Sequence, residues 1–162
     1  MNLDKLFSMQ KELDEKIEAK HGLHNEPLIE KKLLALLVEV GELANETRCF
    51  KFWSVKPPAP VQVILEEYVD GIHFILSIGL ELKLDKTDLH FEGGEDRTVT
   101  EQFLTIYESI ATLKQKLTSE NYVTLFNHYI HLGKLLGFSN EQIEQAYVAK
   151  NDVNHERQMQ GY

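Results

Sequence analysis

Apolar residues along the chain recur mainly at spacings of three and four, and no segment shows a convincing period-two alternation. The pattern predicts an all-α protein, a helical bundle of about five to six helices. The expected helices cover about residues 2–20, 27–48, 61–83, 98–118, 120–136 and 140–159. Gly137 is expected to close the fifth of these, and Ser139 with Gln142 three residues later is typical of a capped start for the sixth.

A proline-rich segment, residues 56–60, separates the second and third expected helices. It cannot be helical throughout, because proline lacks an amide donor and restricts the residue before it. The third helix can therefore return beside the second. It is apolar around most of its circumference, which is typical of a central helix. Residues 84–97, with two glycines and several acids, are expected to form an exposed loop.

Size and charge limit the class of protein. A chain of 162 residues with 43% hydrophobic and 27% charged residues fits one compact domain, here residues 1–162. Its net charge of -9 argues against binding a nucleic acid polymer, which would need a broad basic surface. The single cysteine, Cys49, fits a reducing compartment. We find no membrane span and no secretory leader, so we expect a soluble, cytoplasmic protein with no membrane partner.

Two pairs of acidic residues lie in strongly apolar stretches, Glu39 with Glu42 and Glu67 with Asp70. Residues three apart share a helix face, so each pair can present two carboxylates in one direction. Buried carboxylates must be neutralised by a cation or paired with basic residues, and few basic residues are near them in sequence. A metal site is therefore favoured. An all-oxygen ligand set suits Mg²⁺, or Mn²⁺ in its place, and the remaining coordination positions suit a phosphorylated ligand.

Two other interpretations of the acids are weaker. A single pair of glutamates at this spacing is usually solvated, and Glu46 and Glu66 are expected to be bystanders. Asp70 and His73 resemble one ligand pair of a di-iron carboxylate bundle, but that architecture needs two such pairs. Only one is found.

The last expected helix carries a stripe that begins apolar and becomes polar, formed by Ile143, Tyr147, Lys150, Asn154 and Arg157. It is either a helix emerging from the core into water or a surface that binds phosphate and sugar groups. Trp53, which follows the first acidic helix, either fills the core or stacks on a base.

Taken together, these segments resemble the dimeric dUTPases, which belong to the all-α nucleoside triphosphate pyrophosphatases that include MazG-like enzymes. The resemblance covers nearly the whole chain. It rests on five segments: Met9-Gln10-x-x-Leu13-Asp14-x-x-Ile17, Glu39-Val40-Gly41-Glu42-Leu43-Ala44-Asn45-Glu46, Phe50-Lys51-Phe52-Trp53-Ser54, Glu67-x-x-Asp70-Gly71-x-His73-Phe74-x-Leu76-Ser77 and Lys150-Asn151-x-x-Asn154-His155-x-Arg157-Gln158-x-x-Gly161-Tyr162.

The resemblance implies a homodimer that uses Mg²⁺ to hydrolyse dUTP to dUMP and pyrophosphate, and that also accepts dUDP. It implies that Glu39, Glu42, Glu67 and Asp70 hold the metal, with Glu39 also orienting or deprotonating the attacking water. The other implied contacts are Gln10 and Trp53 with uracil, Phe74 with the face of the deoxyribose, His73 and Asn154 with the sugar, and Lys150, Arg157 and Tyr162 with the phosphates.

Two alternatives stay open at this point. One is a broader MazG-like pyrophosphatase that clears other non-standard nucleotides, since the paired acids alone indicate only the superfamily. The other is a non-catalytic helical dimerisation module, in which the acids are structural.

Overall fold

The structure is a computed structural model that describes residues 1–85, 89, 94 and 96–161. These residues form six α-helices and no strand, which confirms the all-α prediction. The helices are α1 (Leu3–His21), α2 (Ile29–Thr47), α3 (Val61–Glu81), α4 (Val99–Gln115), α5 (Ser119–Leu135) and α6 (Asn140–Gln160). Of the loop expected at 84–97, residues 86–88, 90–93 and 95 lie outside the described residues. None of these six helices is long and apolar enough to cross a lipid bilayer.

The helix ends follow local signals in the sequence. Gly22, in the left-handed conformation at φ 66°, ends α1. The expected cap of α6 is present as a complete capping box, in which the Ser139 side chain accepts from the Gln142 amide and the Gln142 side chain accepts from the Ser139 amide. Thr98 and Glu101 form a second capping box at the start of α4.

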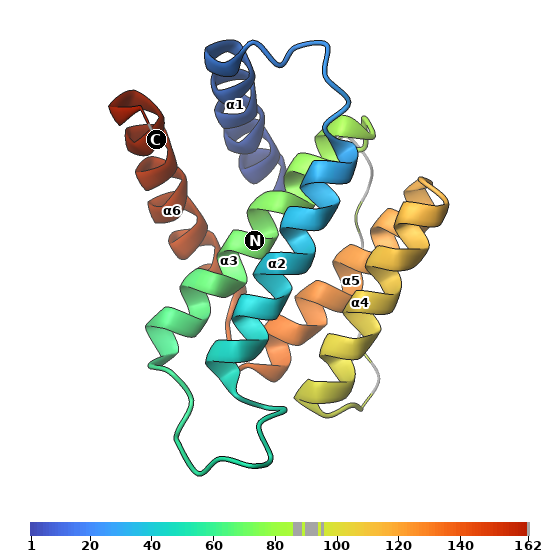
Figure 1. Ribbon diagram of the computed structural model, residues 1–162, viewed down its shortest axis with the longest axis vertical. Helices are drawn as coiled ribbons and strands as arrows, with labels where there is room; N and C mark the ends of the chain where they lie inside the picture. Colours follow the sequence, from blue (N-terminus) through green and yellow to red (C-terminus); the bar gives the residue numbers. More distant parts are fainter. Residues whose placement is uncertain (86–88, 90–93, 95, 162) are drawn as a thin grey trace.

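Helix α3 is the central element of the bundle. It packs against α1, α2, α5 and α6, and most of its circumference is buried, as its apolar sequence predicted. Figure 1 shows α2 and α3 side by side and antiparallel, with α4 and α5 on one side of this pair and α1 and α6 on the other. Groups on α2 and α3 therefore meet groups on α1 and α6.

The segment between α2 and α3 is held by Arg48. Its backbone is left-handed at φ 59°, which ends α2, and its guanidinium donates to Ser54 Oγ (2.6 Å) and to the Lys56 carbonyl (3.1 Å). The Ala59 amide then donates to the Glu46 carbonyl (3.0 Å). These bonds return the chain to the end of α2, so that α3 starts beside it.

A pair of buried tyrosines joins α3 to α5. The Tyr68 hydroxyl donates to the Tyr129 carbonyl (3.1 Å), the Tyr129 hydroxyl donates to the Tyr68 carbonyl (2.9 Å), and the two rings stack with centroids 4.8 Å apart. Each hydroxyl lies where a glycine leaves room: a Cβ on Gly71 would lie 2.0 Å from the Tyr129 oxygen, and one on Gly133 would lie 2.5 Å from the Tyr68 oxygen. The segment of α3 that carries Asp70 is thus held closely against α5.

Candidate active site

Three carboxylates meet between α2 and α3. Glu39 of α2 and Glu67 and Asp70 of α3 are all partly buried, and each places one carboxylate oxygen within 4.8 Å of the other two. Their positions follow from the sequence spacing, because Glu67 and Asp70 share one face of α3 and the antiparallel packing brings Glu39 against it. The spacing fits three oxygen ligands around one or two small cations.

The electrostatics of this cluster favour a cation. Burial, then the charges of Asp70, Glu42 and Glu67, raise the pKa of Glu39 to about 7, and the opposing charge of Lys150 does not cancel them. Burial and the neighbouring acids also raise the pKa of Glu67. A bound divalent cation would remove this penalty, and the all-oxygen donor set is the one that Mg²⁺ and Mn²⁺ prefer.

Lys150 is the basic partner of the cluster. Its Nζ lies 2.6 Å from Asp70 Oδ2, in an ion pair that is mostly buried. Burial raises the pKa of Asp70 while this hydrogen bond and the Lys150 charge act against the rise. The alternative that a basic residue pairs with the acids is therefore correct for Asp70. Sequence proximity did not reveal it, because Lys150 lies on α6.

Glu42 lies apart from the three clustered carboxylates. Its side chain is exposed, and with Glu46, Asn45 and Glu67 it lines a separate hollow on the α2–α3 surface. Its charge nevertheless reaches the cluster, since it contributes to the raised pKa values of Glu39 and Glu67.

A cavity of about 410 Å³ opens beside the cluster. It is lined by residues from α1, α2, α3 and α6, together with Leu28. Eight of the residues singled out from the sequence line it: Gln10, Glu39, Asp70, His73, Phe74, Lys150, Asn154 and Arg157. Along α6, Ile143 and Tyr147 are buried, whereas the following polar positions of the stripe reach this cavity.

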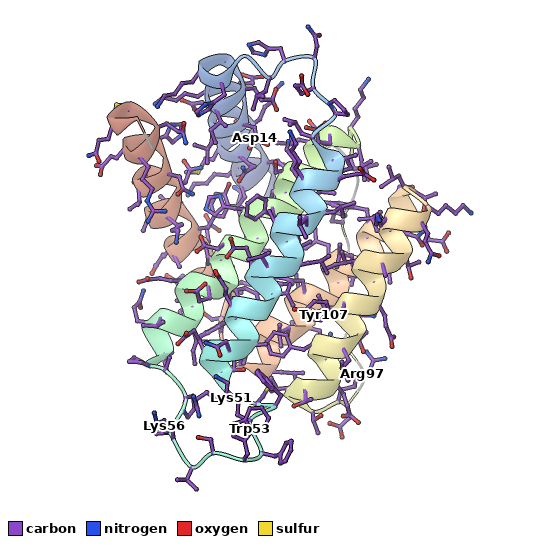
Figure 2. The ribbon with its side chains drawn as sticks, viewed as in Figure 1. Asp14, Lys51, Trp53, Lys56, Arg97 and Tyr107 are labelled. Atoms are coloured by element: carbon purple, nitrogen blue, oxygen red, sulfur yellow. The ribbon has the colours of Figure 1, made fainter. Side chains whose placement is uncertain are left out.

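Trp53 is not part of this arrangement, and Tyr162 is not described by the structure. Trp53 is 64% exposed in the segment between α2 and α3, where its ring makes edge contacts with Phe50 and Phe52, so it does not fill the core (Figure 2). It is not among the residues that line the cavity. Tyr162 lies outside the described residues.

A hydrogen-bond network that the sequence did not predict forms another part of the cavity wall. Gln10 Nε2 donates to Asp14 Oδ1 (2.7 Å), and Gln10 Oε1 lies 2.8 Å from both His73 Nδ1 and the Tyr147 hydroxyl. Ser77 donates to Asp14 Oδ2 (2.6 Å). The His73 ring also stacks on Tyr147, with centroids 4.1 Å apart. A polar residue at the i+4 position from Gln10 was the only local signal of this network.

Burial is the largest cause of the pKa shifts of the two titratable groups His73 and Asp14 in this network. Burial and then the nearby charge of Lys150 lower the pKa of His73 to about 3, so its imidazole is neutral at physiological pH. Burial raises the pKa of Asp14, while bonds from Ser77 and Gln10 and the charge of Lys32 act against the rise. Lys32 Nζ lies 3.6 Å from Asp14 Oδ2 and also pairs with Glu18 and Glu81.

Comparison with known proteins identifies the family of the chain. The sequence profile of the dUTPase family matches residues 2–162, which is nearly the whole chain. A search of curated proteins finds no match. The profile covers α1 through α6 and hence every element that lines the cavity. The chain therefore belongs to the dUTPase family.

Proposed function

We propose that this dUTP diphosphatase uses Mg²⁺ to hydrolyse dUTP to dUMP and pyrophosphate, and that it also hydrolyses dUDP. The observation that carries the metal requirement is the cluster of Glu39, Glu67 and Asp70 oxygens within 4.8 Å of one another. The pKa values of all three carboxyl groups stay raised despite the charges of Lys150 and Arg157, so the cluster favours further positive charge.

The three clustered carboxylates would hold the metal, with Glu42 adding negative charge at its edge. When bound, Mg²⁺ would supply charge stabilisation to the phosphate chain and lower the pKa of a coordinated water. Glu39 is our candidate for orienting or deprotonating the attacking water.

The remaining cavity residues would bind the nucleotide. Lys150 and Arg157 bring positive charge to a cavity that also contains Glu39 and Asp70, so they suit phosphate oxygens. Phe74, partly buried one turn after Asp70, would pack on the deoxyribose, with His73 and Asn154 near the sugar. Gln10 would contact the uracil. Trp53 would also contact the uracil, and Tyr162 would also contact the phosphates.

Assays of pyrophosphate release test the proposal. We expect turnover of dUTP that requires Mg²⁺, is abolished by EDTA and exceeds turnover of dCTP, dTTP and UTP. Glu67→Gln should lower kcat by about 10²-fold or more, because it removes a ligand oxygen. Glu66→Gln is the matched control: it removes the neighbouring, exposed carboxylate and should leave kcat within about twofold. Equal turnover of several deoxynucleotides would instead favour a broader MazG-like pyrophosphatase.

The proposal includes a homodimer that acts in the cytoplasm. Helices α2 and α4 pack together and leave three large apolar side chains exposed, Leu34 and Val38 on α2 and Leu104 on α4. Covering such side chains is a common driving force for association. Sedimentation should show a dimer that Val38→Lys weakens, and a monomer at micromolar concentration would contradict this part. The free thiol of Cys49 fits the reducing environment of the cytoplasm.

A further inference from the structure

The orientation of the Gln10 side-chain amide is fixed by its surroundings. Gln10 is 3% exposed and lines the cavity. Its oxygen has two partners, the Tyr147 hydroxyl and His73 Nδ1, whereas its nitrogen donates to one described acceptor, Asp14. An amide nitrogen carries two hydrogens. One N–H of Gln10 is thus committed to Asp14, and the other is available to a ligand in the cavity.

Asp14 is the group that determines this orientation. Both Asp14 oxygens accept hydrogen bonds, one from Gln10 Nε2 and one from Ser77, so the nitrogen of Gln10 faces the carboxyl group and its oxygen faces away. The Ser77 hydroxyl holds the second carboxylate oxygen at 2.6 Å, and Lys32 lies 3.6 Å from it. A flipped amide would place two oxygens in contact and would lose the bond donated by Tyr147.

The same orientation fixes the tautomer of His73. Because Gln10 Oε1 is an acceptor, His73 Nδ1 must carry the proton, and Nε2 then presents a lone pair. Nε2 is buried and has no partner within the described residues. His73 itself is only 6% exposed and lines the cavity. Of the groups that line the cavity, which include Asp14 and Ser77, Gln10 therefore offers a hydrogen-bond donor and His73 an acceptor.

We infer that Asp14, supported by Ser77 and Tyr147, is a positioning residue that makes the cavity select uracil over cytosine by fixing the orientation of the Gln10 amide. This inference rests on the proposed function. Uracil has a carbonyl acceptor at C4, which the free Gln10 N–H can meet, and cytosine has an amino donor there, which would face another donor. His73 accepts from a donor of the same nucleoside, either the ring N–H of uracil or a sugar hydroxyl. Buried polar walls of this kind reject a mismatched partner strongly, because a group is left unpaired.

The test measures base discrimination by binding, separately from catalysis. Calorimetric titration with dUMP and with dCMP, in buffer containing Mg²⁺, gives the ratio of the two dissociation constants for each variant. Asp14→Asn is isosteric, and its amide can donate as well as accept, so both orientations of Gln10 become satisfied. We expect the preference for dUMP to fall by about tenfold or more. Tyr147→Phe, which removes one donor to the Gln10 oxygen, should lower it by about threefold.

Tyr122→Phe is the matched control. It also removes a buried tyrosine hydroxyl, one that donates to the Ile75 carbonyl (3.0 Å), from a residue that does not line the cavity. It should keep the wild-type preference. If Asp14→Asn fails to fold by circular dichroism, Ser77→Ala, which releases one oxygen of Asp14, should lower the preference in the same direction.

A preference for dUMP that stays within about twofold of wild type in Asp14→Asn and Tyr147→Phe would overturn the inference, as would a wild type that shows no preference. Weaker binding of both nucleotides by the same factor would show a merely structural role and would also overturn it. Pyrophosphate release is measured in parallel on the same samples. If the wild-type protein prefers dUMP but does not hydrolyse dUTP, the proposed function is contradicted. If the wild-type protein hydrolyses dUTP and the variants keep its ratio of dissociation constants for dUMP and dCMP, only the inference is contradicted.

Discussion

Replacing Glu39 with glutamine should make the metal-free protein more stable while it weakens metal binding. In the folded chain, burial and the charges of Asp70, Glu42 and Glu67 raise the pKa of Glu39 from 4.5 to about 7. The charged form is therefore less favourable in the folded state than in the unfolded state. Glutamine has nearly the same shape and no charge, so this penalty disappears along with one metal ligand.

The magnitude follows from the shift in pKa. A rise from 4.5 to about 7 corresponds to at most about 3.4 kcal/mol, at 1.36 kcal/mol per unit. The Glu39 side chain is only partly buried and solvent screens its charge, so we reduce the expected gain to about 1–1.5 kcal/mol. For a chain of this size, that raises the melting temperature by about 2–6 °C.

The gain depends on pH. Between the two pKa values the folded state binds more protons at Glu39 than the unfolded state, so wild-type stability falls as the pH rises from 4.5 through about 7. The penalty is complete above that range and absent below pH 4.5. Glu39→Gln should therefore exceed wild type at pH 8 and approach it at about pH 5.

Urea denaturation in EDTA at pH 5 and pH 8 provides the measurement, with Glu66→Gln as a control for removing a nearby exposed charge. Titration with Mg²⁺ then should stabilise wild type, by about 2.7 kcal/mol at one hundred times the dissociation constant, and stabilise Glu39→Gln much less. A gain for Glu39→Gln that is equal at the two pH values, or absent at both, would refute the electrostatic reasoning.

Two further predictions follow from the packing. Gly71→Ala would place a Cβ about 2.0 Å from the Tyr129 hydroxyl and should destabilise the fold by about 2–3 kcal/mol in urea denaturation. Gly22→Ala, at an exposed helix end with open space, should act only through its positive φ. A loss in Gly71→Ala no larger than that in Gly22→Ala would argue against the contact with Tyr129. Phe74→Ala should lower the preference for dUTP over UTP by about tenfold in kcat/KM, and an unchanged ratio would exclude Phe74 as the residue that rejects a 2′-hydroxyl.

Much of the fold could be predicted because its determinants are local. The helical spacing of apolar residues, the prolines at 57, 58 and 60, and the Ser139 cap each act within a few residues, and the helices form where these signals place them. The helix ends agree less closely with the expected ranges. The start of α2 falls at Ile29 rather than about residue 27, since no side chain caps it and Leu28 takes the cap position.

The candidate site could be predicted only in part. The meeting of Glu39, Glu67 and Asp70 follows from spacing on two adjacent helices, and their geometry agrees with that expectation. The bond from Lys150 to Asp70 and the network around Gln10 depend on how α6 and α1 pack against α3, and they join residues far apart in the chain. No local pattern encodes such pairs. Glu42, three residues after Glu39 on α2, is exposed, which the spacing of the acids did not predict.

The central helix α3 carries residues of both ends of the candidate site. Glu67 and Asp70 lie toward its first half, and His73 and Ser77 lie one to two turns further along the same helix. A helix rises about 1.5 Å per residue, so the step from Asp70 to Ser77 is about 10 Å and cannot change while the tyrosine pair holds α3 in place. The separation between the carboxylates of Glu67 and Asp70 and the His73 and Ser77 side chains is therefore set by a single helix. Deleting one residue between Asp70 and His73 would shorten it by about 1.5 Å and rotate one set by about 100° away from the other.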